Sequence, residues 1–229
     1  MNDRLRQTQD MLARHHRDGE AFAQMMKDTF DGRFNETFWE MWEQHIEPAL
    51  SDVPVILDLG TGPGMLLRAL AARYPKVRAI GVECAEYMLE AAVDLPEGCE
   101  TIAADLHDPH FPLQDSVVDA AVASMVLHEM HQPVRALREV ARCLKAGGCL
   151  YMLDWVRAPL KQYLDDTALD VFATDTPPEA LEDLFIHFIE HNRFSADDLV
   201  FMLENTGFRV LEATALKDGR QARIIAEKL

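Results

Sequence analysis

Long apolar runs are absent from this sequence. No stretch reaches the length of about 18 uninterrupted apolar residues that a membrane-spanning helix requires. The opening stretch, MNDRLRQTQDMLARHHRDGE, is polar throughout and contains no apolar signal core. We therefore expect no membrane segment, and a chain that stays in the cytoplasm.

Positive charge is also scarce. Lysine and arginine contribute 22 residues against 39 aspartates and glutamates, so the formal net charge is −17. A surface this acidic repels phosphate backbones, and the sequence has no stripe of basic residues with interleaved aromatics. The composition argues against RNA or DNA as a partner and favours small-molecule substrates, cationic ones among them.

Cysteine is rare, and the spacing of the cysteines suggests neither a disulfide framework nor a zinc site. None of the four cysteines forms a C-x-x-C pair, so we predict reduced thiols that pack as small apolar side chains. This prediction covers Cys84, Cys99, Cys143 and Cys149.

The stretch Val55–Leu70, VILDLGTGPGMLLRAL, carries the strongest pattern. Apolar residues around Asp58 predict a buried strand, three alternating glycines predict a turn, and an apolar helical face begins at Met65. Glycines allow positive φ and close approach, and free amides at a helix start suit a polar or anionic ligand. NAD binding is disfavoured, because Met65 stands where the last glycine of G-x-G-x-x-G belongs.

The pattern D-x-G-x-G-x-G resembles the first motif of class I S-adenosylmethionine (SAM) dependent methyltransferases. Further along, Val117–Trp155 resembles small-molecule methyltransferases of the ubiquinone/menaquinone-biosynthesis type. The resemblance runs from about Val53 to the C-terminus. It implies a doubly wound, Rossmann-like α/β domain with a seven-stranded mixed sheet. It also implies SAM as cofactor and methyl transfer to a small-molecule acceptor as the activity.

The resemblance further implies where SAM binds. Glu83 ends the second predicted strand and would meet the ribose hydroxyls, and Asp105 follows the third and would accept a hydrogen bond from the adenine amino group. Tyr87 and Met88, on the helix that follows Glu83, would flank the adenine. The full expected set is Asp58, Gly60, Thr61, Gly62, Gly64, Glu83, Cys84, Tyr87, Met88, Asp105, Leu106, Ser124 and Met125.

Histidines supply the candidate for catalysis. Methyl transfer needs positioning and, for a weakly acidic nucleophile, a base. His128 directly follows the fourth predicted strand and is the candidate for this base. The alternative is that His128 only forms hydrogen bonds within its loop. We predict no metal site, because the H-E-x-H around Glu129 is not H-E-x-x-H. His131 replaces the family's usual proline and adds a titratable group at the expected pocket mouth. His187 and His191, one helical turn apart, receive no role.

Helical segments accompany the sheet region. Residues 1–50 are predicted to form two or three amphipathic helices that serve as a lid, broken at Asp18-Gly19 and Asp31-Gly32. Residues 51–229 would form the SAM-binding domain, with an acidic helical cap inserted at about 157–195 on the substrate side.

The predicted lid is rich in large apolar side chains. These side chains favour a mobile lid over cofactor and substrate. The alternative is that they pack permanently on the sheet, and for the two tryptophans this alternative is preferred. The adjacent pair His15-His16 is expected to be solvated. The apolar set is Phe22, Met25, Met26, Phe30, Phe38, Trp39 and Trp42.

Two other functions fit the same motifs. One is an enzyme that uses SAM without methylating, for example by cyclising it, and the other is a binding module that holds SAM or S-adenosylhomocysteine. Their products separate them, because methylation yields S-adenosylhomocysteine, cyclisation yields methylthioadenosine and inert binding yields neither. The acceptor and the oligomeric state, monomer or homodimer, are not specified by the sequence.

Overall fold

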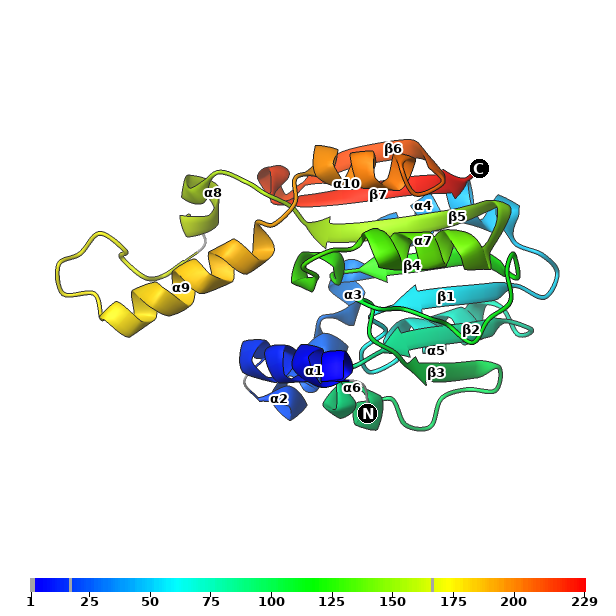
Figure 1. The fold of residues 1–229 in the computed structure, drawn as a ribbon, viewed down its shortest axis with the longest axis horizontal. Coiled ribbons are helices and arrows are strands. Elements are labelled where there is room, and N and C mark those ends of the chain that lie inside the picture. Colours follow the sequence, from blue (N-terminus) through cyan, green and yellow to red (C-terminus); the bar gives the residue numbers. More distant parts are fainter. Residues whose placement is uncertain (1–2, 17, 166) are drawn as a thin grey trace.

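A seven-stranded sheet runs through the molecule in the order β3-β2-β1-β4-β5-β7-β6 (Figure 1). The computed structural model describes residues 3–16, 18–165 and 167–229. Neighbouring strands from β3 to β5 pair in parallel, and β7 lies antiparallel between β5 and β6. The doubly wound α/β fold with a mixed sheet is confirmed. The strands are β1 (Val55–Leu59), β2 (Arg78–Glu83), β3 (Cys99–Ala103), β4 (Val118–Ser124), β5 (Leu144–Trp155), β6 (Phe208–Leu216) and β7 (Gln221–Lys228).

Helices cover both faces of this sheet and the edge where the parallel strands end (Figure 1). The α-helices are α1 (Asp3–His16), α2 (Gly19–Asp28), α3 (Phe30–Arg33), α4 (Glu36–Met41), α5 (Met65–Arg73), α6 (Glu86–Ala91), α7 (Val134–Cys143), α8 (Leu160–Leu164), α9 (Pro178–His191) and α10 (Ala196–Glu204). Shorter turns are η1 (Trp42–Ile46), η2 (Glu47–Ala49), η3 (Leu127–Glu129) and η4 (Lys217–Gly219).

Alternation along the strands produces one apolar cluster on each face. In β1, Leu57 packs in the same cluster as Leu137 of α7 and Leu203 of α10. Its neighbour Ile56 points the other way, into a cluster with Trp42 of η1. Successive strand residues face opposite sides, so a buried strand with helices on both faces is apolar at nearly every position.

The aromatic residues around α4 belong to the second of these clusters. Phe38 and Trp42 are fully buried, and the Phe38 ring lies edge-on to Tyr151 of β5 with centroids 4.8 Å apart. Asn35 caps α4, because its side-chain oxygen accepts from the Phe38 amide at 3.1 Å. Residues 36–46 are therefore part of the sheet core, which leaves α1, α2 and α3 as the segment able to cover a site.

Two local boundaries differ from the sequence prediction. Asp31-Gly32 does not interrupt the helical structure, because both residues lie inside the short helix α3. The Phe30 and Phe34 rings stack there with centroids 4.9 Å apart. The sequence predicts the last parallel strand over Cys149–Leu153, whereas β5 begins at Leu144, with a register shift against β4 that absorbs Gly147 at φ +77°.

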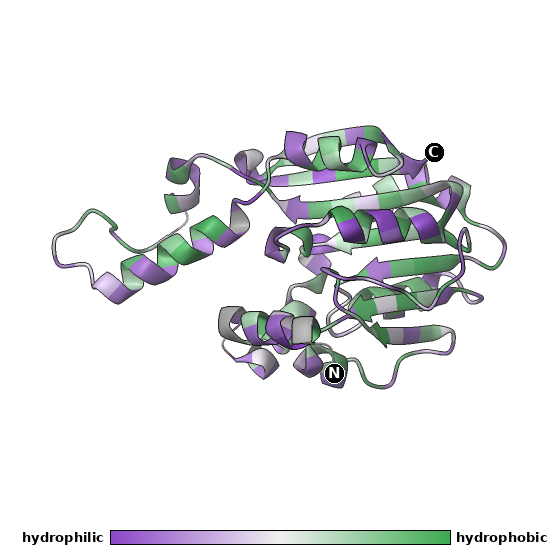
Figure 2. Cartoon of the chain, in the orientation of Figure 1, coloured by the Kyte–Doolittle hydropathy of each residue, from purple (hydrophilic) through white to green (hydrophobic). Residues whose placement is uncertain are grey.

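The segment from α8 to α9 projects from the body as an arm (Figure 1). Its two ends are held together, because the Ala158 amide donates to the Asn192 side chain at 2.8 Å and Arg157 donates to the Arg193 carbonyl at 2.7 Å. Figure 2 shows apolar residues along α9, and Phe172 in the preceding loop is 86% exposed. Within the described residues, no helix combines the length and apolar character needed to cross a membrane.

Candidate active site

A cavity of about 610 Å³ lies at the carboxyl ends of the parallel strands. It sits where the strand order reverses between β1 and β4, the position at which open α/β sheets bind ligands. Strand tips and the glycine turn form its floor, and residues of α1, α2 and α3 form the opposite wall. The N-terminal segment therefore lines the cavity, as expected of a lid, while its mobility stays a prediction.

The glycine turn after β1 is built from left-handed residues. Gly60 and Gly62 have φ of +64° and +54°, and a Cβ on Gly60 would lie 2.7 Å from a methyl of Val126. Both glycines line the cavity, together with Thr61. Gly64, also left-handed, caps α5 and faces Leu95, and it is not among the described lining residues. Only the first two glycines therefore border the space for a ligand.

Glu83 locks the glycine turn to the end of β2. Its Oε2 accepts from the Gly62 amide at 3.0 Å, and its Oε1 accepts from the Cys84 and Ala85 amides at 2.8 Å each. Burial raises the pKa of the Glu83 carboxyl, although these three amide donors oppose that rise. With three amide donors, the carboxylate keeps about one of its four lone-pair sites, on Oε2, for a hydroxyl donor in the cavity.

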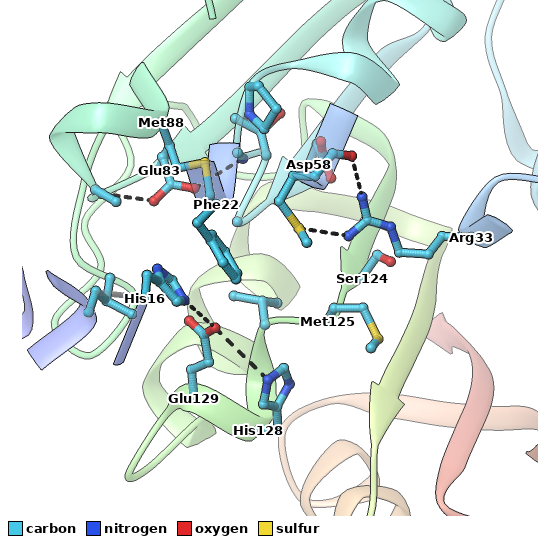
Figure 3. Close-up of a pocket in the computed structure, with 18 of the residues that line it drawn as sticks. His16, Phe22, Arg33, Asp58, Glu83, Met88, Ser124, Met125, His128 and Glu129 are labelled. Carbon is cyan, nitrogen blue, oxygen red and sulfur yellow. Dashed lines mark hydrogen bonds and ion pairs between the residues drawn. The ribbon is translucent and has the colours of Figure 1, made fainter. Parts of the chain in front are cut away.

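Asp58, near the end of β1, is buried without backbone amide donors to match those of Glu83. Burial raises the pKa of Asp58 to about 7; the Thr61 hydroxyl beside it opposes the rise, the nearby Glu83 charge adds to it, and the Arg33 charge opposes it. Arg33 comes from α3, where its guanidinium donates to the Met26 carbonyl at 2.9 Å. Figure 3 shows Arg33 and Asp58 on the same side of the cavity. The pair places a carboxyl and a guanidinium beside the start of α5.

Asp105, after β3, is tied to the N-terminal helix. Its Oδ2 accepts from the Thr8 hydroxyl at 3.0 Å and its Oδ1 accepts from the His107 amide at 2.9 Å. Burial opposes ionisation, but these hydrogen bonds and the His107 ring hold the pKa of Asp105 below its ordinary value. Gln9 of the same helix donates to the Cys84 carbonyl at 2.9 Å. Helix α1 thus closes over the loops that follow β2 and β3.

The remaining expected cofactor residues divide into two groups. Cys84, Met88, Leu106, Ser124 and Met125 line the cavity. Tyr87 does not appear among the described lining residues; its hydroxyl pairs with His16, and its ring packs against the Gly19 backbone. The rotation of about 100° between successive helical residues explains the difference, because Met88 points toward the cavity and Tyr87 points toward α2.

Met125 is a strained residue of this group. It has φ of +59°, a conformation that costs a non-glycine residue about 1–3 kcal/mol. Its amide donates to the Leu153 carbonyl at 2.7 Å, which holds the turn after β4 against β5. Backbone strain of this kind is concentrated at functional sites.

His128 lies in η3, at the edge of the cavity, and is buried. Its Nδ1 is 2.6 Å from Oδ1 of Asp154, a carboxylate with no exposed surface at the end of β5. Burial alone would lower the pKa of His128, but the Asp154 and Glu129 charges outweigh it, so the pKa is raised. Acidic neighbours therefore orient the candidate base and favour its protonated form.

Glu129 joins the two walls of the cavity. Its Oε1 lies 3.1 Å from Nε2 of His16 in α1 and 3.9 Å from Nε2 of His128 (Figure 3). The expectation that His16 is solvated is wrong: its side chain is 5% exposed and stacks on Phe22 with centroids 3.7 Å apart. The side chain of His15 lies outside the described residues.

The other histidines singled out in the sequence are His131, His187 and His191. His131 is exposed, and its amide donates at 3.1 Å to His107, which lines the cavity; its predicted place at the pocket mouth stays a prediction. His187 lines the cavity and pairs with Tyr163, and the His191 side chain lies outside the description. Among the described residues, no three histidine, cysteine or acidic side chains come together as metal ligands.

Sequence reasoning missed several residues of this site. Asp154 carried the same signal as Glu83 and Asp105, an acid at the end of a buried strand, and could have been found. Arg33 and His16 had no such signal, because only the folding of the N-terminal helices brings them to the cavity. Other lining residues without a sequence signal are Trp155, Lys217 and Gln221.

The strand order, the glycine turn after β1 and the acids following β2 and β3 define a class I SAM-dependent methyltransferase fold. Residues 57–152 match the family model described as "Methyltransferase domain". This part of the chain thus matches a methyltransferase domain, in agreement with the resemblance.

Known relatives agree with this assignment. The ubiquinone/menaquinone biosynthesis C-methyltransferase of Syntrophotalea carbinolica is 34% identical over 111 residues, which cover 48% of this chain and 47% of the relative. The trans-aconitate 2-methyltransferase of Azoarcus sp. is 33% identical over 103 residues, 44% of this chain and 39% of that protein. The chain thus spans less than half the length of either relative.

A solved structure extends the likeness to nearly the whole chain. The SAM-dependent methyltransferase from Aquifex aeolicus superimposes with a TM-score of 0.64 at 19% identity, covering 92% of this chain and 98% of that one. At this identity the likeness concerns the fold, including the elements outside residues 57–152.

Proposed function

We propose that this protein transfers a methyl group from SAM to a small-molecule acceptor. The observation that carries the proposal is the row of acids Asp58, Glu83 and Asp105, at or just after the ends of β1, β2 and β3, facing one cavity beside the glycine turn. When bound, SAM supplies a methyl group already activated on a sulfonium. The chain then has to hold the donor, orient the acceptor and exclude water.

The residues present fit this cofactor. Glu83 offers lone pairs to ribose hydroxyls, and Asp105 offers an acceptor to the adenine amino group, next to the backbone amide of Leu106. Met88 supplies an apolar wall, and the cavity volume lies within the range of about 300–1,000 Å³ usual for small-molecule sites. Arg33 and Asp58 provide opposite charges for the carboxylate and ammonium of the methionine part.

One buried hydroxyl also fits a bound molecule in this cavity. No hydrogen-bond partner of Ser124 Oγ is present among the described residues, although this atom is buried beside the cavity. Buried polar groups are nearly always satisfied, so a bound molecule or water is expected there.

Calorimetry with SAM and S-adenosylhomocysteine tests the cofactor half of the proposal. We expect micromolar or tighter binding to the folded protein. No detectable heat or competition at millimolar ligand, with the fold verified by circular dichroism, would remove the proposal entirely.

Incubation with methyl-labelled SAM and metabolite extracts tests the reaction. We expect S-adenosylhomocysteine together with a labelled small molecule; methylthioadenosine, or neither product, would indicate one of the two other SAM-related functions. Fractionating the extract into amines, neutral compounds and acids also tests the expectation of cationic acceptors, which labelling confined to the other fractions would contradict.

A further inference from the structure

His128 contacts the carboxylate of Asp154, and the other contacts of that carboxylate fix the carboxylate's orientation. Asp154 has no exposed surface; its Oδ2 accepts from the Leu127 amide at 2.6 Å and from Val126 at 3.2 Å, and its Oδ1 accepts from Trp155 at 2.8 Å. The same Oδ1 faces His128 Nδ1 at 2.6 Å. The carboxylate can therefore neither turn away nor leave the imidazole.

This contact decides which nitrogen of His128 is basic. An ionised carboxylate only accepts hydrogen bonds, so Nδ1 must carry a proton and donate it to Asp154. The basic nitrogen of the neutral ring is then Nε2, on the side of the ring toward Glu129 and the cavity (Figure 3). A buried acid that fixes the tautomer of a histidine in this way prepares it to accept a proton from a substrate.

The charges around His128 suit a base that becomes cationic during the reaction. Asp154 at the end of β5 and Glu129 in the same turn favour the imidazolium, and Arg193 after α9 opposes it. His16 of α1 contacts Glu129, and His187 of α9 lines the same cavity. The two carboxylates outweigh burial, and the pKa of His128 is raised.

We infer that the acceptor reacts through a hydroxyl group whose proton moves to Nε2 of His128, with Asp154 as the positioning residue and Glu129 stabilising the imidazolium. This inference rests on the proposed methyl transfer. The hydroxyl oxygen forms the bond to the methyl carbon, the carbon–sulfur bond of the donor breaks with its electron pair on sulfur, and the proton leaves His128 for solvent afterwards.

The chemistry of the base favours this acceptor class. A carboxylic acid is already ionised near neutral pH, so it requires no base before transfer and the dyad would be superfluous for it. A phenolic or enolic hydroxyl is un-ionised at neutral pH, and a histidine with a raised pKa is matched to it. An ammonium group must also lose a proton before it can react, and the atom that carries the label separates it from a hydroxyl.

A structural role for the dyad is the competing reading, since the Asp154 contacts also tie η3 to β5. His128→Asn separates the two, because the Asn side-chain amide can still donate to Asp154 but has no basic nitrogen. Asp154→Asn keeps acceptor capacity for the backbone amides and removes the charge. His131→Asn is the matched control, three residues away and exposed.

The first experiment measures the pKa of His128 by NMR in the full chain saturated with S-adenosylhomocysteine, and needs no acceptor. We expect Asp154→Asn to lower that pKa by about one unit or more, Glu129→Gln to lower it by less, and His131→Asn to leave it in place. An unchanged pKa in a folded Asp154→Asn protein would overturn the positioning role.

The second experiment uses the labelled product from extracts incubated with methyl-labelled SAM. We expect the label on oxygen, and a kcat at least about 10²-fold lower for His128→Asn at pH 7 with binding of S-adenosylhomocysteine retained. We also expect the acid limb of the pH–rate profile to move to lower pH in Asp154→Asn. Label on carbon, nitrogen or sulfur, or full turnover by His128→Asn, would overturn the inference.

Failure of the inference is distinguishable from failure of the proposed function. Absence of SAM binding or of any labelled product contradicts the function itself. A labelled product made equally by wild type and His128→Asn contradicts the hydroxyl and base assignment alone.

Discussion

Three acids that share one cavity ionise differently because their partners differ. Glu83 is buried but has three amide donors, Asp105 has hydrogen bonds from Thr8 and His107, and Asp58 is buried with a raised pKa of about 7. Hydrogen bonds to the charged form favour it, and burial disfavours it. At the scale of single residues, the site therefore combines a carboxyl near its titration midpoint with an Asp105 that is ionised at neutral pH.

Replacing Glu83 by Gln is expected to weaken SAM binding by about 1.5–3 kcal/mol, because charge-assisted hydrogen bonds to the ribose are lost. The amide oxygen retains part of the bonding to the glycine turn. Calorimetry measures the effect, and Glu90→Gln, exposed on α6, is the control. Unchanged affinity would leave Glu83 with a purely structural role in holding the turn.

Asp58 is expected to make the stability of the protein depend on pH. Its pKa is about 7 in the fold and about 3.9 when unfolded, so between about pH 4 and pH 7 the folded state holds a proton that the unfolded chain has lost. The contribution of Asp58 to the free energy of unfolding therefore falls as pH rises through this window.

Asp58→Asn removes that dependence. We expect urea unfolding at several pH values to show that the free energy of unfolding of the variant rises relative to that of the wild type from about pH 4 to pH 7. Above pH 7 we expect no further change in this difference. A difference between the two proteins that is independent of pH would mean that Asp58 ionises normally in the fold.

At the scale of elements, the N-terminal region contains two parts with different anchorage. Residues around α4 are packed into the sheet core, whereas α1 touches the body through the contacts of Thr8, Gln9 and His16. Two of these contacts are made to Asp105 and Cys84, in the loops expected to hold the adenine. Ligand entry and the position of α1 are therefore coupled.

Deleting residues 1–33 is expected to leave a folded core and to abolish tight SAM binding and turnover, because one wall of the cavity is lost. Hydrogen exchange on the full chain should show the amides of α1 and α2 becoming protected when S-adenosylhomocysteine is added. Equal protection with and without ligand, or full activity of the shortened protein, would remove the lid from the mechanism.

At the scale of the whole molecule, the net charge of −17 limits its partners. We expect no salt-sensitive binding to tRNA or duplex DNA in filter or fluorescence titrations at low ionic strength, where such binding is strongest. Tight binding that weakens steeply with added salt would contradict the small-molecule assignment.

Local patterns in the sequence predicted most of the residues at the strand ends that line the cavity. The strand, glycine turn and helix from Val55 to Leu70 are specified by neighbouring residues, and Glu83 and Asp105 lie where strands end. The wall formed by the N-terminal helices and the turn after β4 were harder to predict, because they depend on contacts between distant segments. Thr8 meets Asp105 across 97 positions of sequence, and a non-periodic loop gave no sign that His128 faces inward and His131 outward.

The arm from α8 to α9 has a consequence for how such a protein changes over evolution. It leaves and re-enters the body at one point, where Arg157 and Ala158 contact residues 192–194, and it reaches the cavity through His187. Because the ends are already joined, a segment of different length or composition can replace it at little cost in loop closure. Under the proposed function, acceptor preference can then diversify by exchange of this one segment, while the residues proposed to hold SAM stay under their own separate selection.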